Sequence, residues 1–216
     1  MLYELRVYDA RAGKLAGLND RFANHTTGFF RDHGIGIVGF WTAEIGTSNQ
    51  LTYMLSFDSM ADREEKWAAF GADPRWQEVR AETEKDGAFV ASIQNSFLRL
   101  TPYSPEPHMT TNIQEMRVYT AMTGKFPALN DRFANHTMKL FEKHGIENVG
   151  YWTSDVGTSN QLTYMLGYDG LGDREEKFGA FGSDPEWHKA RAASEVDGLL
   201  TRRSQNSILR RTSYSP

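Results

Sequence analysis

A histidine in the stretch NDRFANHT, present at 19–26 and again at 130–137, is the first candidate for chemistry. His25 falls three residues after Phe22 and four before Phe29, which places it on or beside the apolar face of a predicted helix. There it could reach a cavity between helix and sheet and act as an acid, a base or a ligand-orienting donor. The alternative is a structural histidine at the core edge, satisfied by a polar neighbour. His136 in the second copy poses the same choice.

Three polar residues at alternate positions of the first predicted strand form the second candidate site. Glu4, Arg6 and Tyr8 share one strand face, and the apolar residues between them are expected to face the helices. The polar face would then meet the second copy, which carries Glu115, Arg117 and Tyr119. Such a set can hold a polar or carboxylate-bearing ligand. The alternative is a salt-bridge network that fixes how the halves dock.

Asparagine and tryptophan residues complete the candidate set. Asn24 and Asn135 precede the two histidines and are predicted to orient a ligand by donating hydrogen bonds. Trp41 and Trp152 lie on predicted strands, where they either line a pocket or pack in the core. The repeated DREEK runs are interpreted as charged helical surface.

Composition excludes several classes of function. The net charge of −4 shows no basic footprint, so nucleic acid is not an expected partner. No apolar run approaches the ~18 residues of a membrane span, and the N-terminus does not resemble a signal peptide, which favours a cytoplasmic location. The chain has no cysteine, and its histidines do not fall at metal-ligand spacings. Neither a metal site nor a cofactor is therefore expected.

A shift of 111 positions superimposes the two halves without a gap, and more than half of the paired residues are identical. The stretch GTSNQLTYML, for example, stands unchanged at 46–55 and 157–166. The predicted organisation is a domain at 1–105, a proline-containing linker at 106–112 and a second domain at 113–216.

Each copy is predicted to be an α+β unit with the element order β-α-β-β-α-β, the ferredoxin-like arrangement. Alternating apolar residues indicate the strands, and Ser59 and Asp73 are expected helix caps. This order gives a four-stranded antiparallel sheet with helices on one face. The predicted elements of the first copy are a strand at 3–9, a helix at 14–33, strands at 37–44 and 51–58, a helix at 60–71 that restarts at 74–86, and a strand at 93–101.

The joint order of several motifs resembles the NIPSNAP family of the dimeric α+β barrel superfamily. The first copy shows YELRVY, VGFWTAEIG, NQLTYML and DREEKWAAFGADPRW, and the second shows QEMRVY, VGYWTSDVG, NQLTYML and DREEKFGAFGSDPEW. The resemblance covers nearly all of both copies. It implies tandem ferredoxin-like units of the dimeric α/β-barrel type, formed within one chain or between chains, and it favours self-association into a homodimer or higher oligomer.

The resemblance leaves two classes of function open. The first is a protein that binds a small organic molecule in or beside the barrel, with chemistry similar to the cofactor-independent monooxygenases or isomerases of the superfamily. Under this first hypothesis, His25 and His136 are acid/base candidates, and Arg6 and Arg117 anchor an anion. The alternative is a non-catalytic interaction module whose polar face is a docking surface. A cavity lined by His25 and the Glu4, Arg6 and Tyr8 set would favour the first class.

Overall fold

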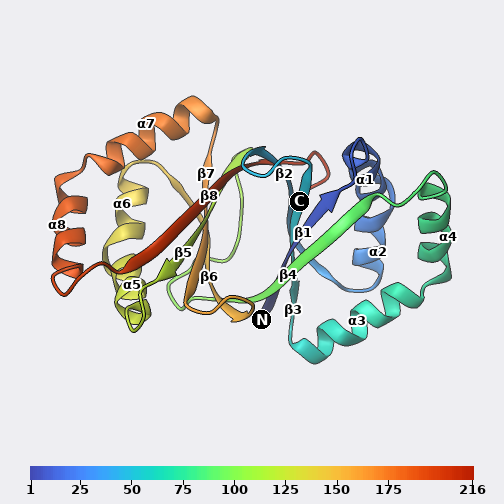
Figure 1. Cartoon of the computed structure of the whole chain (residues 1–216), viewed down its shortest axis with the longest axis horizontal. Coiled ribbons are helices and arrows are strands. Elements are labelled where there is room, and N and C mark those ends of the chain that lie inside the picture. The colour runs from blue at the N-terminus through green and yellow to red at the C-terminus, as the bar shows by residue number, and fades with distance from the viewer. The chain divides into compact units, whose positions relative to one another are not determined.

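The computed structural model describes residues 1–216 and divides into two compact units (Figure 1). Unit 1 consists of Met1–Arg99 and Arg211–Pro216, and unit 2 consists of Leu100–Arg210. No helix is long and apolar enough to cross a membrane.

Unit 1 contains an antiparallel sheet in the order β4-β1-β3-β2, because β1 pairs with both β3 and β4 and β2 pairs with β3. This register places Arg6 opposite Tyr53 on one side and opposite Asn95 on the other. The sequence prediction of a ferredoxin-like order is confirmed. The strands are β1 (Leu2–Ala10), β2 (Gly36–Ile45), β3 (Gln50–Phe57) and β4 (Val90–Leu100).

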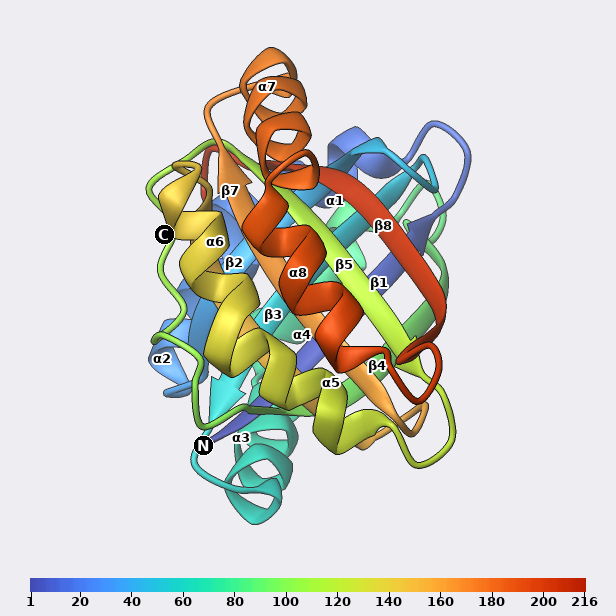
Figure 2. The ribbon, with the colours of Figure 1, turned by 90° about the vertical axis from the view of Figure 1, so that its left-hand side faces the viewer.

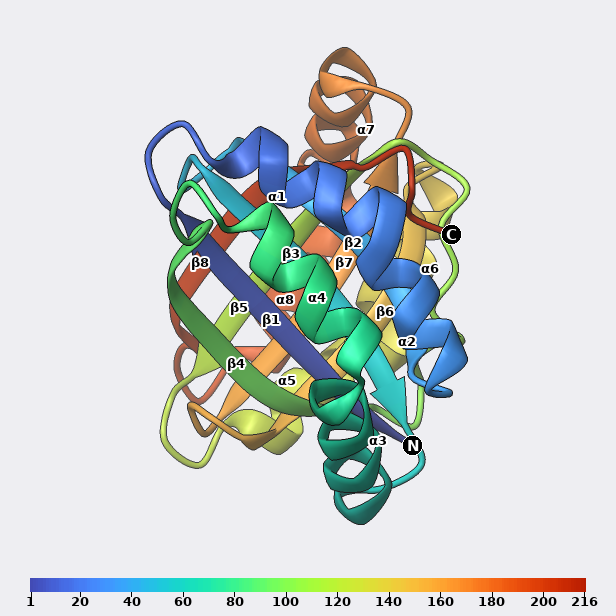
Figure 3. The same cartoon turned by 90° about the vertical axis from the view of Figure 1, so that its right-hand side faces the viewer.

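The helices of unit 1 cover one face of this sheet (Figure 3). The predicted caps are confirmed: the Ser59 side chain accepts a hydrogen bond from Asp62 N, and the Asp73 side chain accepts one from Arg75 N. Gly34 ends the first helical run with φ +65°, a value that favours glycine. The helical segments are α1 (Leu15–Arg21), the π-helix η1 (Phe22–Thr26), α2 (Thr27–Asp32), α3 (Met60–Ala72) and α4 (Pro74–Thr83).

Unit 2 repeats this arrangement, with the strand order β8-β5-β7-β6 and helices on one face (Figure 2). Its elements are β5 (Ile113–Ala121), α5 (Phe126–Arg132), η2 (Phe133–Thr137), α6 (Met138–Lys143), β6 (Glu147–Val156), β7 (Gln161–Tyr168), α7 (Leu171–Gly182), α8 (Pro185–Ser194) and β8 (Thr201–Arg211).

Each unit is completed by the segment that follows the last strand of the other repeat. In unit 1 the Tyr214 hydroxyl donates to Asn19 Oδ1 at 2.6 Å, and Thr212 N donates to Phe40 O at 3.0 Å. In unit 2 the Tyr103 hydroxyl donates to Asn130 Oδ1 at 2.7 Å. The compact units therefore differ from the sequence repeats in these short segments.

Aromatic side chains dominate the core between sheet and helices. In unit 1 the ring of Phe22 lies 5.3 Å from that of Tyr53 and 5.6 Å from that of Phe40, measured between centroids. Phe133, Tyr164 and Tyr151 form the equivalent cluster in unit 2. Burial of such large side chains is the main favourable contribution to folding.

Candidate functional site

The polar residues of the first strand lie on the face covered by the helices, so the sequence prediction of the opposite face was wrong. Glu4 contacts Arg63 and Trp67 of α3, and the ring of Tyr8 packs against Phe22 of η1. The error arose because apolar residues were assigned to the helix side by hydrophobicity alone. The charged side chains of Glu4 and Arg6 can be buried on that side because hydrogen-bond and ion-pair partners surround them there.

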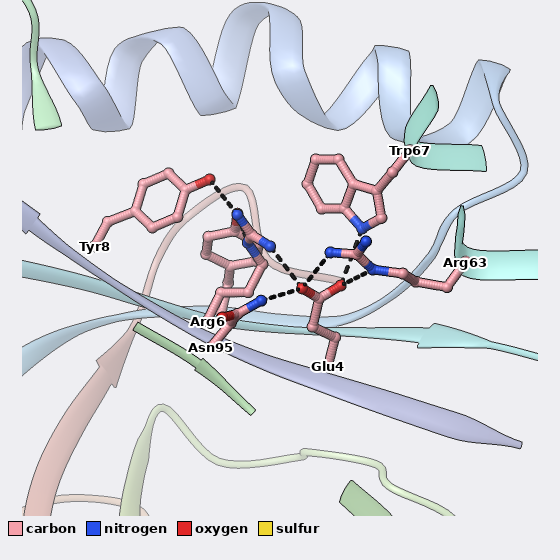
Figure 4. A network of polar contacts seen from close by, with 7 residues as sticks. Glu4, Arg6, Tyr8, Arg63, Trp67 and Asn95 are labelled. Carbon is pink, nitrogen blue, oxygen red and sulfur yellow. Dashed lines mark hydrogen bonds and ion pairs between the residues drawn. The ribbon is translucent and has the colours of Figure 1, made fainter. Parts of the chain in front are cut away.

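The Glu4 carboxylate is fully buried and accepts five hydrogen bonds (Figure 4). Two come from Arg63, at 3.0 Å from Nε and 2.9 Å from Nη2, and one comes from Arg6 Nη1 at 2.6 Å. Trp67 Nε1 donates at 2.9 Å and Asn95 Nδ2 at 3.0 Å. Both carboxylate oxygens are thus saturated by protein donors.

The Arg6 guanidinium donates three hydrogen bonds within the same network. Its Nε donates to the Tyr53 hydroxyl at 2.8 Å, and its Nη2 donates to the Tyr8 hydroxyl at 3.2 Å. The guanidinium carbon also lies 4.6 Å from the ring centroid of Trp67, at cation–π distance. Glu4 and Arg6 therefore form a buried structural network in which both carboxylate oxygens are occupied by protein donors.

The partners of Glu4 determine its protonation. Burial by itself would raise the pKa of the carboxyl, but the hydrogen bonds from Arg63 and Asn95 and the charges of Arg6 and Arg63 outweigh burial and lower this pKa to about 2. Burial also raises the pKa of the Tyr53 hydroxyl, so this tyrosine stays neutral beside Arg6. Glu4 is thus ionised over the physiological pH range.

Unit 2 carries the same network with one donor fewer. Glu115 accepts from Arg117 Nη1, from Arg174 at 2.9 Å and 3.1 Å, and from Asn206 at 2.8 Å. Phe178 occupies the place of Trp67, so it supplies an aromatic face at 4.8 Å from the Arg117 guanidinium but no N–H group. Tyr119 accepts from Arg117 Nη2 at 3.2 Å.

His25 lies in the π-helix η1, and its predicted position at the core edge was wrong. His25 and Asn24 are exposed, as are His136 and Asn135 in unit 2, while Phe22 and Phe30 are buried. In an uninterrupted α-helix two residues eight positions apart differ by about 80° around the axis. The wider π turn removes this offset, so Phe30 replaces Phe29 as the core residue. The structure therefore separates the histidines from the Glu4 and Glu115 networks.

The remaining predicted site residues are buried in the core. Trp41 and Trp152 have no exposed surface, so they do not line an open cleft. The interpretation of DREEK as charged surface was wrong for its arginine, because Arg63 and Arg174 bind the buried glutamates.

Sequence reasoning also missed Trp67, and it missed two network members on strands, Tyr53 and Asn95. Both lie opposite Arg6 on neighbouring strands, and both are unchanged in the second copy. The signal for Asn95 was the repeated QNS stretch, because pairing this stretch with the first strand places Asn95 opposite Arg6.

A cleft occurs at equivalent positions in both units, beside the fourth helix and the last strand. It measures about 540 Å³ in unit 1 and about 330 Å³ in unit 2. We call these the unit 1 cleft and the unit 2 cleft. Lining residues identical in both are the pairs Tyr8 and Tyr119, Arg21 and Arg132, Trp76 and Trp187, Arg80 and Arg191, and Glu84 and Glu195.

A buried arginine lies at the wall of each cleft. Arg21 is 6% exposed, and its Nη1 donates to Glu84 Oε1 at 2.8 Å, while its Nε has no hydrogen-bond partner. Its guanidinium carbon lies 5.6 Å from the ring centroid of Trp76 and 5.0 Å from that of Phe89. Arg132 is 5% exposed, bonds Glu195 at 3.0 Å and likewise has an unpartnered Nε. A buried unpartnered donor is uncommon in a folded protein.

The carboxylates of the clefts are ionised. Burial would raise the pKa of Glu84, but the hydrogen bond and charge of Arg21 outweigh burial and lower it. The pKa of Glu195 is lowered in the same way by Arg132. Among the lining residues that are identical in both clefts, each cleft therefore has two arginines and one ionised glutamate.

A third cleft, of about 690 Å³, occurs in unit 2, where residues 103–111 lie against β6. The Glu147 carboxylate within it is engaged by the hydroxyls of Thr110 and Thr111 at 2.7 Å and 2.6 Å. No cluster of three or more histidine, aspartate or glutamate side chains is placed to hold a metal ion.

Two solved structures share the fold along nearly the whole chain. A candidate monooxygenase from Lactobacillus acidophilus superimposes with a TM-score of 0.62 at 8% identity, over 97% of this chain and 93% of that chain. An anthrone oxidase-like protein superimposes with a TM-score of 0.58 at 9% identity, over 100% of this chain and 92% of that chain. At such low identity these likenesses show the fold alone. The predicted class, tandem ferredoxin-like units of the dimeric α+β barrel type, is confirmed.

Sequence comparison identifies the family. A NipSnap homolog from Dictyostelium discoideum is 24% identical over 185 residues, which are 80% of this chain and 72% of the relative. The sequence profile of NIPSNAP matches twice, at residues 3–105 and 114–216. The chain therefore belongs to the NIPSNAP family and carries two of its domains in tandem.

Proposed function

We propose that each unit binds a small organic anion in its cleft. The observation that carries this proposal is the buried arginine at the wall of each cleft, Arg21 or Arg132, whose Nε has no protein partner. Guanidinium groups pair with carboxylates and phosphates through parallel hydrogen bonds. An anion in the cleft would pair with the guanidinium charge and offset part of the cost of burying it.

The rest of the cleft suits an organic molecule rather than a bare ion. Trp76 and Phe70 supply aromatic surface in unit 1, with ring centroids 4.7 Å apart, and Tyr8 supplies a hydroxyl. Both cleft volumes fall within the roughly 300–1,000 Å³ typical of ligand sites. The unit 1 cleft combines apolar and aromatic side chains with a few polar groups, which is the usual composition of such sites.

Catalysis at the clefts is a separate and more specific part of the proposal. The exposed His25 and His136 lie outside the clefts, and their acid/base role stays a prediction. The Tyr8 hydroxyl, which accepts from Arg6 Nη2 at 3.2 Å, is the hydroxyl at the cleft wall that could orient a substrate for oxidation or isomerisation. Self-association likewise stays a prediction, which light scattering tests.

Mass spectrometry of the denatured purified protein tests the proposal. We expect a co-purified anionic molecule that is lost from a variant in which both clefts are filled, Ala91→Trp with Arg202→Trp. Both positions are exposed strand residues, so the fold should persist. A matched control, His25→Ala with His136→Ala, should retain the molecule. If the filled variant retains it and the histidine variant loses it, the clefts are not the binding sites.

A further inference from the structure

The two clefts differ in the one region where the repeats have diverged most. Residues 88–93 and 199–204 form the longest run of consecutive differences between the repeats, six positions in all. Five of these six positions line the cleft in each unit. Elsewhere the differences are interrupted by identical residues every few positions, so divergence is concentrated at this wall.

The substitutions change both the charge and the size of the cleft. Ala91 and Ser92 in unit 1 correspond to Arg202 and Arg203 in unit 2, and Ala88 corresponds to Leu199. The unit 1 cleft is thus lined by two arginines and one glutamate, and the unit 2 cleft by four arginines and one glutamate. The volume falls from about 540 Å³ to about 330 Å³. The second cleft is smaller and more cationic.

The polarity of the strand wall changes in the same direction. Ile93 lies opposite Tyr8 in the sheet, and its counterpart Ser204 lies opposite Tyr119. An apolar side chain beside the tyrosine of the first cleft is therefore replaced by a hydroxyl beside the tyrosine of the second. A ligand body that packs against Ile93 loses that apolar contact in unit 2.

We infer that the two clefts take different classes of ligand: the unit 1 cleft takes a monoanion with a sizeable apolar body, and the unit 2 cleft takes a smaller dianion. This inference rests on the proposed function. A phosphate monoester and a dicarboxylate share the dianionic chemistry, and arginine binds both. The buried arginine, Arg21 or Arg132, pairs with one negative charge in its cleft. In the unit 2 cleft, Arg202 and Arg203 pair with the second negative charge.

A tryptophan in each cleft provides a separate reporter for each site. Trp76 lines the first cleft and Trp187 the second. The full chain labelled with 5-fluorotryptophan is titrated at pH 7.5 with benzoate, phenyl phosphate and isophthalate. Fluorine NMR follows the resonances of Trp76 and Trp187 among the five tryptophans. Trp76→Phe and Trp187→Phe assign them.

We expect at least one of the two dianions to bind at Trp187 about fivefold more tightly than at Trp76, with benzoate showing no such preference. The ratio of the affinities for phenyl phosphate and isophthalate shows whether the unit 2 cleft prefers a phosphate monoester or a dicarboxylate. Because Arg202 and Arg203 are exposed, the preference should shrink as salt is added.

Exchange of the two positions provides the matched control. Arg202→Ala with Arg203→Ser should abolish the dianion preference at Trp187, and Ala91→Arg with Ser92→Arg should create one at Trp76. Equal affinity of every probe for both clefts would overturn this inference and leave the proposed function standing. If neither resonance responds to any probe and no molecule co-purifies, the proposed function fails as well.

Discussion

Glu4 and Arg6 are buried charges that are stable because each is surrounded by partners. A buried carboxylate without partners would be strongly unfavourable, but five hydrogen bonds converge on Glu4, two of them from the same guanidinium of Arg63. The network connects β1, β3 and β4 to α3, so it fixes the helix against the sheet. Its repetition around Glu115 indicates a requirement of the fold rather than of one ligand site.

Replacement of Glu4 by Gln should therefore destabilise unit 1. The variant keeps the shape of the side chain but leaves the guanidinium groups of Arg6 and Arg63 without their counter-charge. We expect a loss of about 3 kcal/mol in the free energy of unfolding, measured by urea denaturation. Glu65→Gln, at an exposed position of α3, should change the free energy of unfolding by less than about 0.5 kcal/mol. Equal values for the two variants would contradict the structural role of the network.

The lowered pKa of Glu4 predicts a specific dependence of stability on pH. The folded-state pKa is about 2 and the ordinary value is 4.5, so folding favours the ionised form. The stabilisation is present in full above pH 4.5 and is lost as the pH falls from about 4.5 towards 2. The melting temperature should decline across this window in the parent chain and decline less steeply in Glu4→Gln. Parallel curves for the two proteins would show that other carboxyls control acid unfolding.

At the scale of the element, the π-helix explains both what the sequence predicted and what it missed. The first helical region followed from ordinary 3.6-residue periodicity and its end from Gly34, and the helices after Ser59 and Asp73 followed from their capping residues. Periodicity could not show the extra residue within FANHT, because the stretch has no glycine or proline to mark it. One unrecognised π turn rotated the expected face and placed His25 towards the core. The sheet face was missed for a related reason: hydrophobicity does not reveal that buried charges are paired.

The extra residue of η1 predicts unequal effects for a deletion and an insertion. Deletion of His25 leaves Phe22 and Phe30 seven positions apart, two turns of a regular α-helix, so Phe30 stays in the core. An alanine inserted after His25 places them nine apart, which turns Phe30 away from the core whether or not the π turn persists. We expect the insertion to cost about 3–5 kcal/mol, as does loss of a buried phenylalanine, and the deletion to cost about 1 kcal/mol. Thermal unfolding followed by circular dichroism measures both. A deletion as costly as the insertion would show that the π turn is itself required.

At the scale of the whole molecule, the repeats in the sequence and the compact units in space do not coincide. The gapless duplication was visible in the sequence, and the family profile follows the same repeats. The sequence could not show where the segments after β4 and β8 pack, because identical residues at 103–105 and 214–216 fit either unit equally well. Their contacts settle this point: Tyr214 belongs with Phe40 and Asn19 of unit 1.

This exchange of segments makes a prediction that runs against the sequence order. Tyr214→Ala removes the hydrogen bond to Asn19 and a ring contact of 5.3 Å with Phe40, so it should destabilise unit 1, although the residue belongs to the second repeat. Hydrogen exchange should accelerate in α1 and β2. Tyr103→Ala removes the equivalent bond to Asn130 and the 5.8 Å ring contact with Tyr151, so exchange should accelerate in α5 and β6 instead. Each loss should be about 1–3 kcal/mol, because a half-buried aromatic ring and a partly buried hydrogen bond are removed together. If Tyr214→Ala accelerated exchange in α5 and β6 and left α1 and β2 unchanged, each terminal segment would pack on its own repeat.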